Sequence, residues 1–177
     1  ALLKAIETGD PKAVEVVDET QYIQHNPLTK TGNVGLAELF ARLSKTNPHV
    51  EIVRAFEDGN FVFAHTDYDF NVKEVGFEVF RFENDQVVEH WDNLQSKPDH
   101  LNPAGHSMLD GPREAVDTHK TEENRKLVRS FIEEALINNE LYRLDHYISP
   151  ESYTEHNPHL TDGLPALQQE FTANPKR

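Results

Sequence analysis

The first part of the chain places its apolar residues at the spacing of α-helices. Residues 1–8 predict the end of one helix, which Gly9-Asp10-Pro11 would stop. A short second helix is expected over residues 13–17, and a third over Gly32–Ser44, where the apolar side chains fall on one face. The intervening residues 22–30 have no such period and predict an ordered loop. Within it, Asn26 precedes a proline and is therefore biased toward an extended conformation, which fixes the direction of His25.

From Val50 the apolar period changes from that of a helix to two, which is typical of β-strands. The alternation predicts four strands, at residues 50–56, 61–71, 75–82 and 86–95, with turns at residues 57–60 and 83–85. Helices followed by an antiparallel meander indicate an α+β domain, with the helices covering one face of the sheet.

The last third of the chain predicts helices without strands. Residues 96–118 are rich in proline, glycine, serine and aspartate and are expected to be a linker. Helices are then predicted at residues 122–139, 141–148 and 164–172. Because their apolar stripes must be covered, we expect either strands outside this sequence or another surface to pack against them.

A hexapeptide occurs twice in the chain. Tyr22-Ile23-Gln24-His25-Asn26-Pro27 returns 131 residues later as Tyr153-Thr154-Glu155-His156-Asn157-Pro158, and seven of nineteen positions are identical over residues 22–40. Each copy follows a helical pattern, which indicates an internal repeat. The expected domains are residues 1–95, a linker at 96–118 and a partial second copy at 119–177. Because the chain opens inside a helical pattern and copy two lacks strands, we expect a piece of a longer two-domain protein.

Composition and charge exclude several classes of partner. The net charge of −14 opposes binding to nucleic acid and to anionic membrane surfaces. No apolar run approaches the ~20 residues of a membrane-spanning helix, so we expect a cytoplasmic protein. The absence of cysteine excludes disulfides, thiolate metal sites and a cysteine nucleophile.

Polar side chains alternate with apolar ones in the hairpin formed by the last two strands. Alternation groups Glu78 with Phe80 and Phe82 on the first arm, and His90 with Asp92 and Leu94 on the second. The opposite face of the second arm carries Val87, Glu89, Trp91 and Asn93. Polar groups on the inner face of a curved sheet cost desolvation free energy unless they line a cavity, where acids and bases can act.

Three segments carry a resemblance to a known family. These are the Tyr22–Pro27 loop, the strand FAHTDY and the hairpin FEVFRFENDQVVEHWDNLQ. Together they resemble the SnoaL-like polyketide cyclase branch of the nuclear-transport-factor-2-like superfamily. The resemblance implies a cone-like curved sheet covered by helices, with a pocket between them. It also implies that Asp92 is the general acid/base of an aldol-type ring closure, and it places Glu78 where related ketosteroid isomerases carry a protonated acid.

The residues and the resemblance together give a set of expected roles. Proton abstraction beside a carbonyl needs a base near the carbon and donors near the enolate oxygen. We therefore expect Asp92, His25 and His65 to be catalytic. Substrate contacts are expected from Tyr22, Asn26, Glu78, His90 and Trp91. The ligand would be a small, mostly apolar carbonyl compound, with no cofactor. The protein would pair as a homodimer or through its two copies.

Structural alternatives stay open for each of these residues. Asp92 could be an exposed carboxylate, His25 could brace its loop, and His65 shares its strand face with Asp67 and Asp69. Glu78 could pair with a surface cation, and Trp91 could be core packing. A metal site would require His25, His65, His90 and Asp92 to converge, and we expect none. The whole domain could also bind a ligand without catalysis or serve as a dimerising module.

Overall fold

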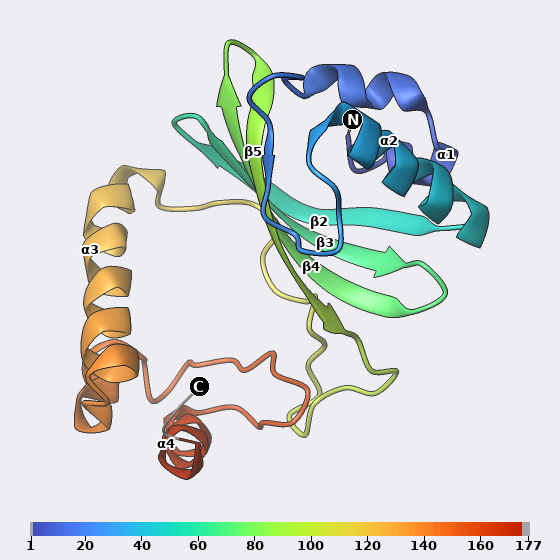
Figure 1. The fold of residues 1–177 in the computed structure, drawn as a ribbon. Helices are drawn as coiled ribbons and strands as arrows, with labels where there is room; N and C mark the ends of the chain where they lie inside the picture. Colours follow the sequence, from blue (N-terminus) through green and yellow to red (C-terminus); the bar gives the residue numbers. More distant parts are fainter. Residues whose placement is uncertain (1, 175–177) are drawn as a thin grey trace. The chain divides into compact units, whose positions relative to one another are not determined.

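The computed structural model describes residues 2–174, which form two compact units (Figure 1). Unit 1 comprises Ala1–Pro98 and Gly111–Glu114, and unit 2 comprises Asp99–Asp110 and Ala115–Arg177. Each unit is described by itself below. None of the helices between residues 2 and 174 combines the length and the apolar character that crossing a bilayer requires.

The helical layer of unit 1 follows the predicted pattern. It consists of α1 (Ala5–Thr8), the 3₁₀ helix η1 (Pro11–Val16), α2 (Gly32–Leu43) and the 3₁₀ turn η2 (Ser44–Thr46). Helix α1 is terminated at Gly9, which adopts a φ of 68° with little steric cost because it has no Cβ. Helix α2 buries Leu36 and Phe40, which share one face at a spacing of four.

The sheet of unit 1 is a four-stranded antiparallel meander with a short parallel strand at its edge. The strands are β1 (Ile23–Gln24), β2 (His49–Asp58), β3 (Phe61–Asp69), β4 (Lys73–Glu83) and β5 (Gln86–Ser96), in the order β1-β5-β4-β3-β2. The turn at Asn84 and Asp85 has positive φ at both residues, as a type I′ hairpin turn requires. The sequence did not predict β1, because two residues carry no period. The strand predicted at residues 50–56 also ends two residues too early, since β2 continues to Asp58.

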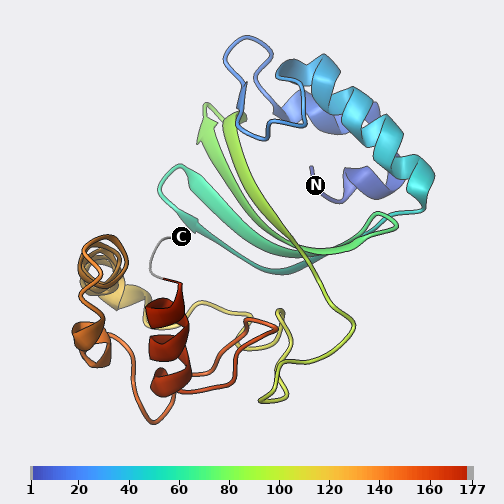
Figure 2. The same cartoon turned by 60° about the horizontal axis from the view of Figure 1, so that its bottom comes forward.

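The sheet bends around the helices, which cover its concave face (Figure 2). The core lies between the two layers and is formed by Leu36 and Phe40 from α2, Tyr68 from β3, Phe80 from β4 and Val87 from β5. A curved antiparallel sheet covered by helices is the predicted α+β architecture. That prediction is confirmed.

Unit 2 contains helices but no strand among its described residues. They are η3 (Thr118–Lys120), α3 (Thr121–Phe131), the π-helix η4 (Ile132–Ile137), the 3₁₀ helix η5 (Leu141–His146) and α4 (Leu164–Ala173). The single helix expected at 122–139 therefore changes to a π-helix at Ile132. A small core of Ala135, Leu144 and Leu164 holds these helices together.

The segment expected to be a linker has no helix or strand between Lys97 and Asp117. Its residues Asp99–Asp110 nevertheless belong to unit 2. Asn102 is buried there, and its amide donates to the backbone oxygen of Glu155 at 2.8 Å.

Candidate functional site

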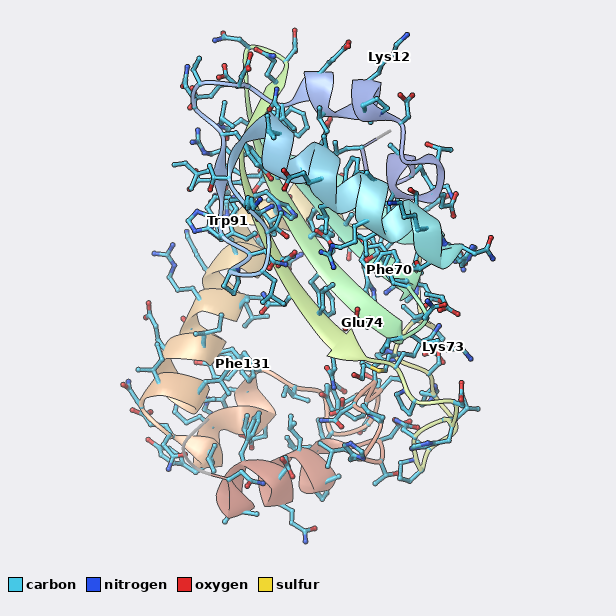
Figure 3. The ribbon with its side chains drawn as sticks, turned by 45° about the vertical axis from the view of Figure 1, so that its right-hand side comes forward. Lys12, Phe70, Lys73, Glu74, Trp91 and Phe131 are labelled. Atoms are coloured by element: carbon cyan, nitrogen blue, oxygen red, sulfur yellow. The ribbon has the colours of Figure 1, made fainter. Side chains whose placement is uncertain are left out.

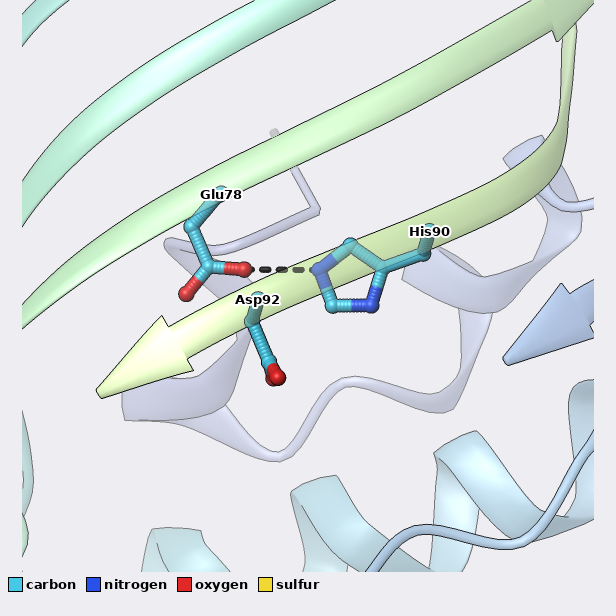
Figure 4. A group of neighbouring side chains, drawn as sticks. All are labelled: Glu78, His90 and Asp92. Carbon is cyan, nitrogen blue, oxygen red and sulfur yellow. Dashed lines mark hydrogen bonds and ion pairs between the residues drawn. The ribbon is translucent and has the colours of Figure 1, made fainter. Parts of the chain in front are cut away.

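Three polar side chains meet on the concave face of unit 1 (Figure 4). Antiparallel register places Glu78 of β4 opposite Asp92 of β5, and Phe80 opposite His90. Because side chains alternate along a strand, Glu78, His90 and Asp92 all point to the same side. One ligand atom from each lies within 4.8 Å of the others. The predicted grouping of His90 with Asp92 on one arm, and of Glu78 on the other, thus forms a single cluster.

Glu78 and His90 form the buried part of this cluster, at 3% and 7% exposure. The Nε2 atom of His90 lies 2.7 Å from Oε2 of Glu78, and its Nδ1 atom lies 3.0 Å from Oε1 of Gln24. That Gln24 oxygen also accepts the backbone N–H of Asn26 at 2.9 Å, so it is an acceptor and Nδ1 must carry a proton. The Glu78–His90 contact then needs one further proton, on Nε2 or on the carboxyl. The pair therefore holds a shared proton.

Tyr68 reaches the cluster from β3. Its hydroxyl donates to Oε1 of Glu78 at 2.8 Å. The ring lies close to Gly76, where an added Cβ would meet Thr66 Oγ1 first and would also come within 2.8 Å of Tyr68 Cε2. A glycine inside a strand marks such a close approach. Burial, followed by the charge of Glu78, raises the pKa of Tyr68, so the hydroxyl stays a neutral donor.

Asp92 is the more accessible acid of the cluster. It is partly exposed, whereas Glu78 is buried. Its Oδ2 accepts from Nδ2 of Asn26 at 2.7 Å. This bond fixes the orientation of the carboxylate and leaves Oδ1 for another partner.

The loop at residues 22–30 supplies the supporting groups. The backbone N–H of His25 donates to the backbone oxygen of His90 at 3.0 Å, which pairs β1 with β5. The side-chain oxygen of Asn26 accepts the N–H of Leu28 at 2.8 Å and holds the turn at the proline. The Tyr22 hydroxyl accepts from Gln24 at 3.0 Å. Burial, followed by the charges of Asp92 and Glu78, raises the pKa of Tyr22.

The cluster has two chemical capabilities. A carboxylate beside a proton-sharing acid–imidazole pair can move a proton to and from a bound molecule. The same three side chains can also supply one nitrogen and two oxygen ligands to a divalent cation, with Tyr68, Gln24 and Asn26 orienting them. Metal ligands are commonly oriented in this way, although hydrogen bonds alone produce the same arrangement.

The structure does not bring His25 and His65 to this cluster. His65 lies on the convex face, where its Nδ1 accepts from Arg54 at 2.6 Å and its ring stacks on Phe77. Alternation is the reason, because His65 falls between Ala64 and Thr66, which face the helices. The four-residue metal site considered from the sequence is not formed either, since it needed both histidines.

His25 and Trp91 lie together on the other side of β5 from the cluster. Their rings stack with 4.8 Å between the centroids. Trp91 is labelled in Figure 3. The Nε2 atom of His25 lies 2.9 Å from Glu89, whose pKa is lowered by this hydrogen bond and by Arg81. The Glu89 contact and the ring stacking connect the His25 loop to β5 on the face opposite the cluster. Of the expected substrate residues, Tyr22, Asn26, Glu78 and His90 do belong to the hydrogen-bonded network.

An apolar cavity of about 290 Å³ lies on the same face of the sheet. Its lining consists of Leu2, Leu3, Val16, Ile52, Ala55, Val62, Ala64, Phe80, Phe82 and Val87. Phe80, which lines the cavity, stacks on His90 with 4.5 Å between the ring centroids. The lining of this cavity includes Phe80 but none of the three polar side chains of the cluster.

Sequence reasoning missed Tyr68 and Gln24 as parts of the site. Tyr68 pairs with Glu74 in the strand register and reaches Glu78 only by lying along the sheet. The glycine at position 76, inside an otherwise bulky strand, was the available signal. Gln24 has no comparable signal, because its role depends on the pairing of β1 with β5.

Comparisons with known proteins agree with the fold. No family model and no curated protein matches the chain. Among solved structures, an NTF-2 like protein of unknown function from Burkholderia xenovorans is 18% identical, with a TM-score of 0.47, over 69% of this chain and 86% of its own. A candidate polyketide cyclase from Bacillus cereus is 19% identical, with a TM-score of 0.47, over 52% of this chain and 68% of its own. An epoxide hydrolase of the LEH-like type from M. tuberculosis is 19% identical, with a TM-score of 0.45, over 54% of this chain and 77% of its own.

At these identities and TM-scores, the likeness carries no information on activity. The resemblance expected from the sequence is confirmed as one of fold. The chain is similar to nuclear-transport-factor-2-like proteins, including the polyketide cyclase type.

Proposed function

We propose that unit 1 binds a small, mostly apolar carbonyl compound and acts on it as a cofactor-independent lyase or isomerase of the cyclase-like kind. The observation that carries this proposal is the convergence of Glu78, His90 and Asp92 on the helix-covered face. Asp92 is the acid/base, because it is the partly exposed acid of the three and is oriented by Asn26.

The proton balance of the proposed step is simple. The Asp92 carboxylate takes a proton from the carbon next to the substrate carbonyl, and the C–H electron pair moves toward the carbonyl oxygen to give an enolate. The proton shared by Glu78 and His90 stabilises that oxygen. In a ring closure, the enolate carbon attacks an acceptor carbonyl, and the alkoxide that forms takes the proton from Asp92, which returns to the carboxylate. In an isomerisation, the enolate is conjugated with a double bond, and Asp92 returns the proton to a different carbon of that conjugated system.

A second candidate function is ligand binding without turnover. Glu78 and His90 already have hydrogen-bond partners in Tyr68 and Gln24. If these bonds persist when a ligand is bound, the pair cannot stabilise an enolate, and the site would only orient its ligand.

The test uses 2-tetralone as a probe, since it is apolar and has an acidic carbon beside its carbonyl. Deuterium uptake from D₂O at that carbon is measured by NMR for the wild type, Asp92→Asn and the control Glu57→Gln, an exposed residue of β2. We expect exchange in the wild type and in Glu57→Gln, and a loss of about 10²–10⁴-fold in Asp92→Asn.

Equal exchange in the wild type and Asp92→Asn would remove Asp92 from the mechanism. Binding of 2-tetralone without exchange, measured by calorimetry, would replace the proposal with the second candidate. If 2-tetralone neither binds nor undergoes exchange, this ligand class is rejected.

A further inference from the structure

Unit 2 carries an open apolar groove of about 280 Å³. It is lined by Leu127, Val128, Phe131, Tyr147, Ile148, Tyr153, Leu167 and Phe171. Phe131 lies on the inner side of α3 against Tyr147 (Figure 3). Leu127 and Val128 are 48% and 54% exposed. Such a contiguous apolar surface indicates a contact with another structure.

The internal repeat shows what covers the equivalent residues in unit 1. Tyr153, Leu167 and Phe171 lie 131 positions after Tyr22, Leu36 and Phe40. In unit 1 those three residues are 4%, 5% and 2% exposed. They belong to one buried cluster with the strand residues Val50, Tyr68, Phe80 and Val87, which also includes Ile6, Val14 and Val17 from the helical layer and its ends. In unit 2, Tyr153 and Phe171 are only partly buried and face the open groove.

The two loops that precede these residues have corresponding hydrogen bonds. Asn26 N–H donates to the Gln24 side chain at 2.9 Å, and Asn157 N–H donates to the Glu155 side chain at 2.7 Å. The side-chain oxygen of each asparagine then accepts the N–H two residues on, at 2.8 Å in unit 1 and 2.9 Å in unit 2. The local frame that presents Tyr22 to a sheet therefore also exists around Tyr153.

The edge that pairs with a strand in unit 1 is occupied in unit 2, where the backbone N–H of Glu155 donates to the Asp162 carboxylate at 2.9 Å. In unit 1, the His25 N–H donates to β5. The equivalent His156 N–H donates to the Glu155 carboxylate of its own loop at 2.9 Å. The backbone oxygen of Glu155 accepts from the Asn102 side chain at 2.8 Å. The contact proposed below therefore involves the face of a sheet and not strand pairing at this edge.

We propose that the groove of unit 2 docks a curved antiparallel β-sheet that presents an apolar concave face. The repeat selects a sheet over a helix, because strands cover the equivalent residues in unit 1. The chain's net charge of −14 argues against an anionic membrane surface as the occupant.

The test adds such a sheet to the chain at the spacing that the 131-residue repeat predicts. Arg177 lies 131 positions after Thr46, so a second copy of residues 47–96 is appended directly after Arg177 in the full chain. This segment contains β2–β5. Hydrogen exchange at the amides of α3 and α4 is followed by mass spectrometry. We expect at least tenfold slower exchange than in the original chain, because the groove becomes covered.

Matched variants of the appended copy identify the docking face. Phe80→Asp, made in the appended copy only, places a charge on the concave face and is expected to abolish the slower exchange. Phe77→Asp in that copy lies on the convex face and is expected to retain it. Val128→Asp is made in residues 1–177 of the extended chain and alters an exposed residue of the groove. It is expected to abolish the slower exchange.

Unchanged exchange in the appended chain would overturn the proposal. Protection that survives Phe80→Asp or Val128→Asp would also overturn it, because the sheet would then act elsewhere. The outcome is independent of the Asp92 proposal, since none of these changes alters the original Glu78, His90 or Asp92.

Discussion

Phe40 and Phe171 occupy matching positions in two similar sequence segments, and their surroundings differ. Phe40 is 2% exposed beneath a sheet, whereas Phe171 borders an open groove. The loops before them make corresponding hydrogen bonds, and both residues lie in α-helices. Local sequence therefore specifies the helix and the loop, while burial depends on the layer that packs against them.

The largest expected effect is on the stability of the two units. Phe40→Ala should destabilise unit 1 by about 3–5 kcal/mol, because it leaves a cavity in a packed core. Phe171→Ala should destabilise unit 2 by roughly 1–2 kcal/mol, since less of its apolar area leaves water on folding. Trp91 is the single tryptophan and lies in unit 1, so its fluorescence in urea reports that unit. Hydrogen exchange of α3 and α4 reports unit 2.

The conservative variants Phe40→Leu and Phe171→Leu are the controls, and each should lose less than its alanine counterpart. Equal losses for the two alanine variants would show that the groove of unit 2 is packed as tightly as the core of unit 1.

A smaller difference in the free energy of unfolding is expected between variants of the two loop asparagines, Asn26 and Asn157. Asn26→Ala and Asn157→Ala each remove an acceptor from a turn, at a cost of about 1 kcal/mol. Asn26→Ala should cost roughly 1 kcal/mol more, because it also removes the donor to Asp92. Urea unfolding followed by Trp91 measures the first variant, and hydrogen exchange of residues 153–163 measures the second.

The aspartate variants separate the two contributions. Asn26→Asp keeps the turn acceptor but faces Asp92 with a second carboxylate, so it should be destabilising. Asn157→Asp keeps the turn and should be nearly neutral. A neutral Asn26→Asp would contradict the role given to the Asn26–Asp92 bond.

The smallest expected effect is a pH dependence found in unit 2. The pKa of His106 is raised by its hydrogen bond to Asp110, against the effect of burial, and Asp162 adds to the rise. His156 also lies 2.9 Å from Asp110. Because the folded-state pKa lies above the unfolded value, the stabilisation is complete below the unfolded pKa near 6.5. It is lost as the pH rises through the folded pKa.

The imidazole resonances of His106 should therefore titrate above those of a free histidine in NMR spectra. Asp110→Asn should lower that midpoint more than Asp162→Asn does. An unchanged midpoint in Asp110→Asn would refute the assigned cause.

Much of the fold could be predicted from periodicity. The change of apolar period at Val50 separates helices from strands, and the turn at Asn84 and Asp85 was expected at its observed place. The length of β2 and the existence of β1 could not be predicted. They depend on pairing with β3 and β5, which lie far away in the sequence.

The candidate site was only partly predictable. The period of two grouped His90 with Asp92 and Glu78 with Phe80, because alternation depends on the strand alone. The resemblance pointed to Asp92. It did not reveal that His65 faces away from the helices, since its strand offered two faces and the sequence alone did not select one.

By itself, the sequence determined the helical regions, the four long strands, the repeated His-Asn-Pro loop and the division of each long strand into two faces. These features rest on interactions between residues close together in the chain. Only the tertiary structure decided which face the helices cover, that Tyr68 reaches Glu78 across Gly76, and that Phe171 borders a groove. Such outcomes depend on contacts between distant segments, whose free energy is gained only when the layers pack together.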